Sequence, residues 1–429
     1  MGIVIRGGKI LEGSSQKEIK KDIFIQEGII KSIAENIALP KNVQVIEAEN
    51  LIVIPGLVDM HCHLRDPGDP EEETIASGTM SAAKGGFTSI ACMANTTPPI
   101  DSPAAVRYVV SKAKQEGIVN VFPIAAATLG LKGTHLVEME RMIEEGAVAF
   151  SDDGNPISDP RILRLLLEYA RPFGVKIISH PEVLAMSKNG QMNEGVLSTM
   201  LGLEGISSQA EELMVERDIL LAAKFGAIHI THVSTAQSVI MIREAKSKGI
   251  PVTCDTCPHY FSLSEKNVDG FNTFAKVNPP LRTEEDVKEI IKGLKDGTID
   301  AIATDHAPHR EEKKKVEFGL AAKGMVGFET ALPLALTFLS KEIPLAKIIK
   351  MMTINPAKIL GIPKGELKEG AAADLAIIDP NAKHKIDIKQ FASKSKNSPF
   401  DGMEVQGEIV YTIVEGKVVV KEGRLVPLK

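Results

Sequence analysis

The sequence predicts an α/β protein built on a TIM-like (β/α)8 barrel, with a small composite β-sandwich formed by the two chain ends. Between residues 55 and 363, short apolar runs alternate with longer amphipathic stretches about eight times. Outside this region, both ends of the chain contain short alternating strands separated by Gly-containing turns. Eight such units in about 300 residues are typical of the barrel. Periodicity alone also allows a doubly wound sheet.

The elements of the barrel can be assigned in chain order. The expected strands are 57–60, 88–93, 120–125, 148–151, 175–179, 228–231, 251–254 and 300–304. The expected helices include 102–116, 159–170, 210–224, 235–248 and 283–295, which are amphipathic. We therefore predict a barrel domain over 55–363 and a β-sandwich domain made from 1–54 with 364–429.

Composition and charge exclude several classes of protein. Of the 429 residues, 44% are hydrophobic and 25% are charged, which suits a buried core and argues against a disordered or fibrous chain. Fifty basic and 56 acidic residues give a formal net charge of -6, so we expect no nucleic-acid or anionic membrane partner. No apolar run reaches the roughly 18 residues of a membrane span, and the start does not resemble a signal peptide.

The four cysteines are too few for a disulfide framework in a chain of this length. We therefore expect a cytoplasmic protein with reduced thiols. Cys254 and Cys257 have CxxC spacing, which also occurs in redox and zinc sites, but no second CxxC is present to complete a structural zinc site. Ordinary buried thiols are the favoured interpretation.

Residue types that bind metals follow the ends of several predicted strands. Because the carboxyl ends of barrel strands surround one mouth, these side chains should face a single cavity. They are His61, His63, Asp153, His180, His232 and Asp305. Four imidazoles and two carboxylates suit zinc and exceed the three protein ligands that one catalytic zinc commonly uses. We therefore expect one or two Zn²⁺ ions as cofactor.

Roles other than metal binding are expected for one aspartate of an adjacent pair and for most of the other histidines. The adjacent pair at 152–153 cannot point inward together if the strand continues, so one aspartate is expected to be structural. His229 is expected to pack inside the barrel, and His259 could be either a packed or a functional residue. His135 and His384 have no polar companions and are expected at the surface.

The polar residues around the expected metal suggest hydrolysis of an amide. Bound zinc lowers the pKa of water to about 7 and polarises a carbonyl group. A nearby carboxylate, for which Asp305 is the candidate, can accept a proton and return it to a leaving nitrogen. Arg65 shares a strand face with the histidines and offers two donors to a substrate carboxylate. Asn95 and Asn278 can contact amide or imide edges, or simply form turns.

Four segments carry a resemblance to a known family. They read PGLVDMHCHLRDPG at 55–68, MANT at 93–96, VNPPLR at 277–282 and ATDHAPH at 303–309. Together they closely resemble the type I dihydroorotases of the amidohydrolase superfamily, and the resemblance covers essentially the whole chain. It implies reversible cyclisation of N-carbamoyl-L-aspartate to L-dihydroorotate in de novo pyrimidine (UMP) biosynthesis. It also implies two partners, a second copy of the chain in a homodimer and an aspartate carbamoyltransferase.

The resemblance also implies roles for individual residues. The six residues above become the metal ligands, with Asp305 as catalytic acid and base. The implied substrate-binding residues are His63, Arg65, Asn95, Asn278, His309, Lys323 and Gly324. Relatives usually have Phe-Gly where this chain has the pair at 323–324, and another Phe-Gly lies at 318–319, so the register of this contact is open. Asp153 stands where many members of the superfamily have a carboxylated lysine, which leaves one or two metals open.

Two further questions stay open from the sequence. The charged segment 310–326 could be a solvated loop or a lid over bound substrate. The alternative functions are another cyclic amidase, such as a dihydropyrimidinase, hydantoinase or allantoinase, and a non-catalytic partner of aspartate carbamoyltransferase. Arg65 argues against the first, because those substrates lack the ring carboxylate. The complete ligand set argues against the second.

Overall fold

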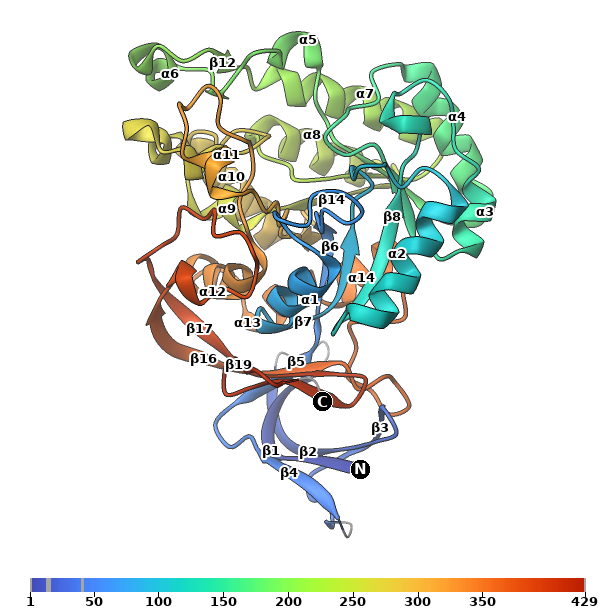
Figure 1. The fold of residues 1–429 in the computed structure, drawn as a ribbon, viewed down its shortest axis with the longest axis vertical. Helices are drawn as coiled ribbons and strands as arrows, with labels where there is room; N and C mark the ends of the chain where they lie inside the picture. The colour runs from blue at the N-terminus through green and yellow to red at the C-terminus, as the bar shows by residue number, and fades with distance from the viewer. Residues whose placement is uncertain (1, 13–16, 40–41, 428–429) are drawn as a thin grey trace.

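The computed structural model describes residues 2–12, 17–39 and 42–427, and it has two parts (Figure 1). The larger part is a barrel of eight parallel strands, and the smaller is a nine-stranded sheet that lies below it in the figure. The barrel closes after its last strand, where the His63 N–H donates to the His306 carbonyl at 2.9 Å. The predicted fold class is confirmed, and the doubly wound alternative is wrong because such a sheet would stay open.

Each predicted barrel strand has a counterpart in the structure. In the order in which they pair, the strands are β6 (Leu57–Cys62), β7 (Phe87–Cys92), β8 (Asn120–Ala125), β9 (Ala149–Ser151), β10 (Lys176–Ser179), β13 (Ile228–Ile230), β14 (Val252–Thr256) and β15 (Ala301–Ile302). Small and branched side chains such as Val58, Ala91 and Ile178 are buried inside. The barrel is therefore a packed core, and only its carboxyl end can hold a ligand.

Helices cover the outside of the barrel. They are α1 (Ile75–Lys84), α2 (Pro103–Glu116), α3 (Met139–Glu144), α4 (Pro160–Ala170), α7 (Gln209–Phe225), α8 (Ala236–Ser247), α10 (Glu284–Asp296), α12 (Phe328–Leu339), α13 (Leu345–Met351) and α14 (Ile354–Leu360). The five predicted helices are confirmed to within two residues at each end. Four of them begin after a Ser, Thr or Asp side chain that accepts a hydrogen bond from the first turn, namely Ser102, Asp159, Thr235 and Thr283.

Several connections at the carboxyl end of the barrel contain short elements of their own. Between β10 and α7 lie α5 (Leu184–Ser187), β11 (Met192–Asn193), α6 (Val196–Leu201) and β12 (Gly205–Ile206). After β14 come α9 (Pro258–Ser262), η3 (Glu265–Phe271) and η4 (Thr273–Ala275), and after β15 comes α11 (Glu311–Lys314). These connections build the walls of the barrel mouth.

The nine-stranded sheet joins the two ends of the chain. Its strands are β1 (Gly2–Glu12), β2 (Lys17–Gln26), β3 (Ile29–Ala34), β4 (Val43–Glu47), β5 (Ile52–Pro55), β16 (Leu375–Lys385), β17 (Glu404–Val414), β18 (Lys417–Lys421) and β19 (Arg424–Leu425). β5 pairs with both β1 and β16, and the sheet bends so that β1 to β4 lie beneath the C-terminal strands (Figure 1). Buried Ile5, Ile25, Ile377 and Ile413 fill the space between them. The predicted domain boundaries remain predictions.

The segment between β16 and β17 leaves the sheet and reaches the barrel mouth. There the side-chain amide of Asn397 donates to the carbonyls of Ala307, at 3.0 Å, and Gly324, at 3.1 Å. The Asn397 side-chain oxygen accepts from the backbone N–H of His309 at 3.0 Å. The C-terminal part of the chain thus fixes two loops of the mouth.

Three simpler expectations can be compared with the structure. All four cysteines are free and buried, which confirms the thiol interpretation. His135 and His384 are exposed, as predicted. Within the described ranges, the structure contains no helix with both the length and the apolar character that crossing a membrane requires.

Candidate metal centre and substrate cavity

The six predicted metal ligands meet at the carboxyl end of the barrel. Two lie at the end of β6, and the others follow β9, β10, β13 and β15. They are His61, His63, Asp153, His180, His232 and Asp305, and all are buried. The parallel strands bring together residues that are up to 244 positions apart, as the resemblance and the barrel geometry both predicted.

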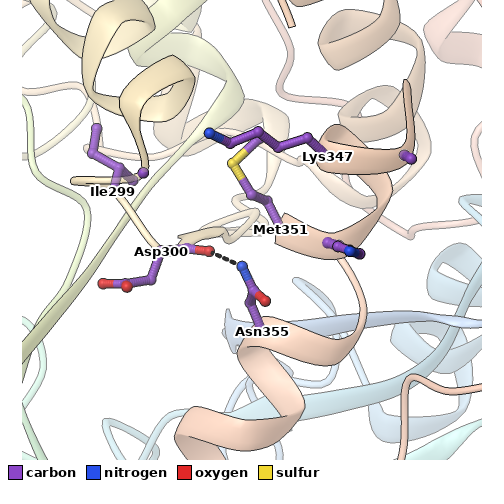
Figure 2. A pocket seen from close by; sticks show the side chains of 8 residues that line it. Ile299, Asp300, Lys347, Met351 and Asn355 are labelled. Atoms are coloured by element: carbon purple, nitrogen blue, oxygen red, sulfur yellow. Dashed lines mark hydrogen bonds between the residues drawn. The ribbon is translucent and has the colours of Figure 1, made fainter. Parts of the chain in front are cut away.

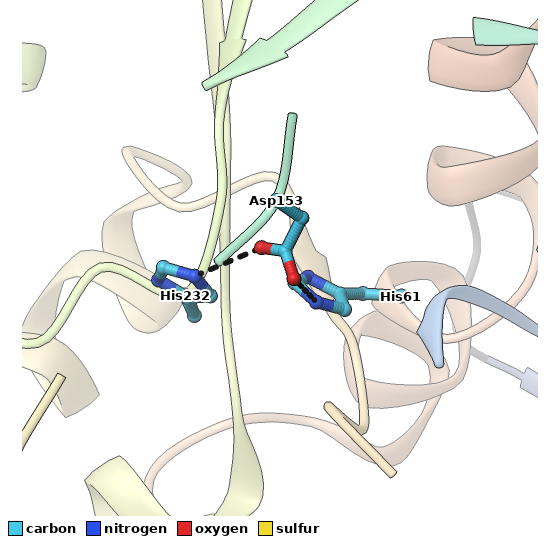
Figure 3. Close-up of side chains that lie close together, drawn as sticks. All are labelled: His61, Asp153 and His232. Carbon is cyan, nitrogen blue, oxygen red and sulfur yellow. Dashed lines mark ion pairs between the residues drawn. The ribbon is translucent and has the colours of Figure 1, made fainter. Parts of the chain in front are cut away.

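The first group of donors consists of His61, Asp153 and His232 (Figure 3). Asp153 lies between the two rings. Its Oδ2 is 3.4 Å from His61 Nε2, and its Oδ1 is 3.6 Å from His232 Nε2. His180 joins this group, since its Nδ1 is 3.4 Å from Asp153 Oδ1 and 2.8 Å from His232 Nε2.

The second group consists of His61, His63 and Asp305, so the two groups share His61. Asp305 Oδ1 is 3.2 Å from His63 Nε2 and 3.5 Å from His61 Nε2. Asp153 Oδ2 is also 3.6 Å from His63 Nε2. Asp153 therefore faces four imidazoles from two directions, which is the position that a bridging carboxylate would need.

The donor atoms fit a divalent cation. Buried His61 Nε2, Asp153 Oδ1 and His232 Nδ1 have no hydrogen-bond partner, although buried polar atoms are rarely left unpaired. Burial alone would raise the pKa of Asp305, but the His61 and His63 rings hold it well below its ordinary value. An ionised carboxylate beside clustered imidazole nitrogens is the donor set that zinc and similar borderline ions prefer.

Hydrogen bonds behind the rings determine which nitrogen faces the centre. His61 Nδ1 is 2.8 Å from Thr231 Oγ1, and Thr231 in turn donates to Asp255. His63 Nδ1 is 2.8 Å from Asn95 Oδ1. Because Nδ1 of both rings is engaged outside, Nε2 of both rings is left to face the metal position.

Glu182 performs the same task for His180, and the sequence reasoning missed it. Its Oε2 is 3.0 Å from His180 Nε2 and accepts from Asn278 Nδ2 at 3.2 Å. Burial opposes ionisation of Glu182, but its hydrogen bond with His180 lowers its pKa to about 2. A signal was present, because Glu182 comes two residues after a predicted ligand, yet an acid at this spacing is common at the ends of strands.

A cavity of about 240 Å³ opens onto the metal donors. Its walls consist of His63, Arg65, Asn95, Asp153, Gly154, His180, His232, Asn278, Asp305, Ala307, His309, Lys323 and Gly324. Every residue that the resemblance implied for substrate binding is on this wall. Of the implied metal ligands, only His61 is absent from it. The structure thus brings all the predicted site residues together.

One side of the cavity carries the positive charge of Arg65. Its Nη2 is 3.4 Å from His309 Nε2, and its Nε donates to the Pro308 carbonyl at 3.2 Å. Glu72, which the sequence reasoning also missed, lies behind this pair, 3.6 Å from Arg65 Nε and 3.3 Å from His309 Nδ1. Glu72 orients both side chains and leaves the outer face of the Arg65 guanidinium open to the cavity.

The cavity wall contains the pair at 323–324, but the register of a substrate contact there remains a prediction. Lys323 and Gly324 line the cavity, whereas Phe318 is buried in a separate apolar cluster. The Lys323 carbonyl is 2.9 Å from His309 Nε2, and the Gly324 N–H donates to the Lys276 carbonyl at 2.9 Å. The Gly324 N–H is thus already used within the protein.

Most of 311–320 is exposed, as the solvated-loop alternative expected, but the segment also contains buried side chains. Lys314 and Phe318 are 0% and 4% exposed, and Ala321 is also buried. The burial of Lys314 was not expected, because it stands among five other charged residues at 310–315. That the segment acts as a lid remains a prediction.

The remaining acids and histidines have structural roles or lie outside the cavity. Asp152 accepts from the backbone N–H groups of Ala127 and Thr128 at 2.9 Å, so it is the structural member of its pair. His229 is buried and its Nε2 is 2.8 Å from Asp255, which confirms the packed interpretation. His259 is buried and does not line the cavity, and burial lowers its pKa to about 4.

A second hollow, of about 300 Å³, lies near the amino end of β15 (Figure 2). It is lined by residues that include Ile299, Asp300, Lys347 and Met351. Asn355 Nδ2 donates to the Asp300 carbonyl at 2.7 Å, and Lys347 Nζ donates to the Lys295 carbonyl at 2.6 Å. These hydrogen bonds connect the elements around the hollow. Among the described residues, its lining contains no group of His, Cys, Asp or Glu side chains that could hold a metal ion.

Comparison with known proteins adds independent findings. The family model described as "Amidohydrolase family" matches residues 52–419. A dihydroorotase from Acetivibrio thermocellus is 52% identical over 98% of this chain and 99% of its own length. A dihydroorotase from Geobacter sp. is 48% identical over 99% and 100%. Among solved structures, an L-hydantoinase (dihydropyrimidinase) from Arthrobacter aurescens superposes with a TM-score of 0.89 at 27% identity, covering 99% of this chain and 97% of its own.

Proposed function

The chain belongs to the amidohydrolase family, and from this premise we propose that it acts as a dihydroorotase. The reaction is the reversible cyclisation of N-carbamoyl-L-aspartate to L-dihydroorotate in pyrimidine biosynthesis. One observation carries the proposal beyond the relatives' names. Arg65, Asn95 and His309 line the same cavity as the clustered imidazoles and carboxylates.

The open face of Arg65 suits the carboxylate that dihydroorotate carries on its ring. A guanidinium can donate two parallel hydrogen bonds to such a group. This charge-assisted pair contributes about 1.5–3 kcal/mol to the free energy of binding. The Asn95 side-chain oxygen is engaged by His63, so its NH₂ group is the part that can donate to the substrate. We place His309 beside them as the third contact of the carboxylate.

We propose that the six clustered residues would hold one or two Zn²⁺ ions, with Asp153 as a ligand. A bound ion would lower the pKa of water and polarise the amide carbonyl. The donor set supports zinc, since it combines several imidazoles with ionised carboxylates.

Asp305 is the proposed catalytic acid and base. Its low pKa keeps it ionised at neutral pH, so its carboxylate can accept a proton from the attacking water and deliver it to the departing ring nitrogen. Asn278 would orient the ring, because its Nδ2 is held by Glu182 while its buried Oδ1 has no partner. That oxygen is therefore free to accept from a ring N–H.

A second candidate is hydrolysis of a neutral cyclic amide, because the matched L-hydantoinase shares the whole fold. The assay that separates the two uses metal-loaded protein on dihydroorotate, dihydrouracil, hydantoin and allantoin, with metal content measured on the same sample. We expect turnover of dihydroorotate alone. Turnover of dihydrouracil without dihydroorotate would replace our proposal with the second candidate.

The Arg65→Ala variant tests whether Arg65 binds the substrate carboxylate. We expect it to raise KM for dihydroorotate by about tenfold or more, because the charge-assisted pair is lost. Arg141→Ala, at a surface position with the side chain 69% exposed, is the matched control and should behave like the wild type. An unchanged KM in Arg65→Ala would remove Arg65 from the substrate site.

The partners and location are also proposals. A cytoplasmic location is supported by the four free thiols, which persist in a reducing compartment. The homodimer and the aspartate carbamoyltransferase partner rest on the resemblance. Light scattering of the purified protein, alone and with a carbamoyltransferase, measures both associations directly.

A further inference from the structure

Lys314 is buried in the middle of a charged run. Its exposed fraction is 0%, whereas the side chains of its neighbours Lys313 and Lys315 are 43% and 63% exposed. Those neighbours form ion pairs with Glu72 and Glu311. Across the described ranges, no carboxylate pairs with Lys314.

Three backbone carbonyls surround the Lys314 ammonium instead. Nζ donates to the carbonyls of Ala322 at 2.8 Å, Gly324 at 3.0 Å and Lys276 at 3.3 Å. An ammonium has three donors, so each of its N–H groups has one acceptor. Burying a charge without a counter-charge costs several kcal/mol, and burial lowers the pKa of Lys314 to about 7. A side chain that only filled this space would be apolar.

The three carbonyls belong to backbone that builds the cavity. Ala322 and Gly324 flank Lys323, whose own carbonyl contacts the His309 ring at 2.9 Å. The Gly324 N–H donates back to the Lys276 carbonyl. Three carbonyl dipoles that converge on one point repel one another unless a cation lies between them. The position of His309 beside Arg65 therefore depends on a charge outside the cavity.

We propose that Lys314 is a positioning residue for the substrate carboxylate, a tethered ammonium that takes the place of a bound monovalent cation among three carbonyls. It holds residues 322–324 in the conformation that places the Lys323 carbonyl against His309. This role rests on the proposed function, since it concerns binding of dihydroorotate. The metal donors lie on the strand ends and do not contact Lys314.

The test compares full-length, metal-loaded variants in a tetramethylammonium buffer that contains no potassium or ammonium. Lys314→Met keeps most of the side-chain volume and removes the charge. We expect KM for dihydroorotate to rise by about tenfold or more with kcat within about threefold, because binding is disturbed and the metal donors are not. Lys315→Met, at the residue that directly follows α11, is the matched control and should leave both constants unchanged.

Lys314→Ala adds a rescue experiment, because it empties the ammonium position. Potassium or methylammonium at about 100 mM should lower its KM severalfold and should not affect the wild type or Lys315→Met, as expected for a cation returning to the carbonyls. If Lys314→Ala does not fold, Lys314→Gln replaces it. Its amide offers two donors and should give a KM between those of wild type and Lys314→Met.

Hydrogen exchange of the Gly324 amide gives a readout that does not need turnover. This amide should exchange faster in Lys314→Met than in wild type or Lys315→Met. An unchanged KM and unchanged exchange would overturn the proposal, as would equal losses in kcat that added cations do not relieve. If the wild type fails to hydrolyse dihydroorotate, the proposed function falls, while the exchange experiment still decides the role of Lys314.

Discussion

The two ends of the barrel differ in how their polar groups are paired. At the carboxyl end, His61 Nε2, Asp153 Oδ1 and His232 Nδ1 are buried without hydrogen-bond partners (Figure 3). At the amino end, part-buried Asn355 donates to the Asp300 carbonyl (Figure 2), and Lys347 donates to the Lys295 carbonyl nearer the surface. Both ends are built from the same strands, so the fold itself does not impose the difference.

The difference indicates which end of the barrel binds a ligand. Unpaired buried donors and acceptors cost about 1–3 kcal/mol each, and a bound ion would pair with those at the carboxyl end. The amino end gains stability from its paired groups, and the carboxyl end gives up stability for a site. Substitutions at the carboxyl end should therefore change binding and turnover, and those at the amino end should change stability.

The largest expected effect is that of Asp305→Ala. We expect kcat to fall by roughly 10²–10⁴-fold, because the proton transfer to the leaving nitrogen is lost. The fold should be retained, as judged by circular dichroism, since the change removes one of several clustered charges. A variant that turned over dihydroorotate near the wild-type rate would contradict the proposed mechanism. It would also contradict the expectation that substitutions at the carboxyl end change turnover.

Lowering the pH should reduce the free energy of unfolding, because His259 at the carboxyl end of the barrel is buried in its neutral form. Its pKa is lowered from 6.5 to about 4 by burial, so the unfolded chain takes up a proton before the folded protein does. The stability that His259 contributes is complete above pH 6.5 and decreases as the pH falls towards 4, by about 3 kcal/mol in all. Urea unfolding at pH 7.5, 5.5 and 4.5 measures the loss. His259→Gln should show a shallower loss, whereas exposed His135→Gln should match the wild type.

Glu182→Ala should weaken metal binding about ten- to a hundredfold, the usual cost of losing a carboxylate behind a metal-binding histidine. Calorimetric titration of the metal-free protein with Zn²⁺ measures the change. Glu404→Ala is a suitable control, because this side chain is 80% exposed on β17 and does not line the cavity. Equal zinc affinities in Glu182→Ala and the wild type would show that Glu182 does not orient His180.

The smallest effect should come from Asn355→Ala at the amino end. Loss of the hydrogen bond to the Asp300 carbonyl should cost about 1 kcal/mol of unfolding free energy. Denaturant unfolding measures this loss, and kcat/KM for dihydroorotate should stay within about twofold of wild type. A large fall in kcat/KM would mean that the two ends are coupled.

The sequence predicted those features that local pattern encodes. The strands were visible because each is an apolar run, and four helices carried capping residues at their first turn. Helix α1 was not among the predicted helices, because its sequence, IASGTMSAAK, is short and rich in small residues. Its start is instead fixed by hydrogen bonds between Thr74 and Ser77.

The metal donors were predictable because four histidines and two aspartates follow predicted strands, and barrel topology places the ends of those strands together. The supporting residues were not. Glu72 and Glu182 resemble ordinary surface acids in sequence, and Lys314 is identical in type to both of its neighbours. What distinguishes these three is a contact with a distant part of the chain, and such contacts exist only in the folded protein.

The pairing of β5 with β16 also orders events during synthesis. β5 leaves the ribosome early, but its second neighbour follows about 320 residues later. Until then β5 presents an open edge, the kind of surface that promotes aggregation. A chain that terminates before residue 375 never covers this edge, and it also lacks Asn397 at the barrel mouth. Completion of the polypeptide, coverage of β5 and assembly of the barrel mouth are therefore linked through the composite sheet.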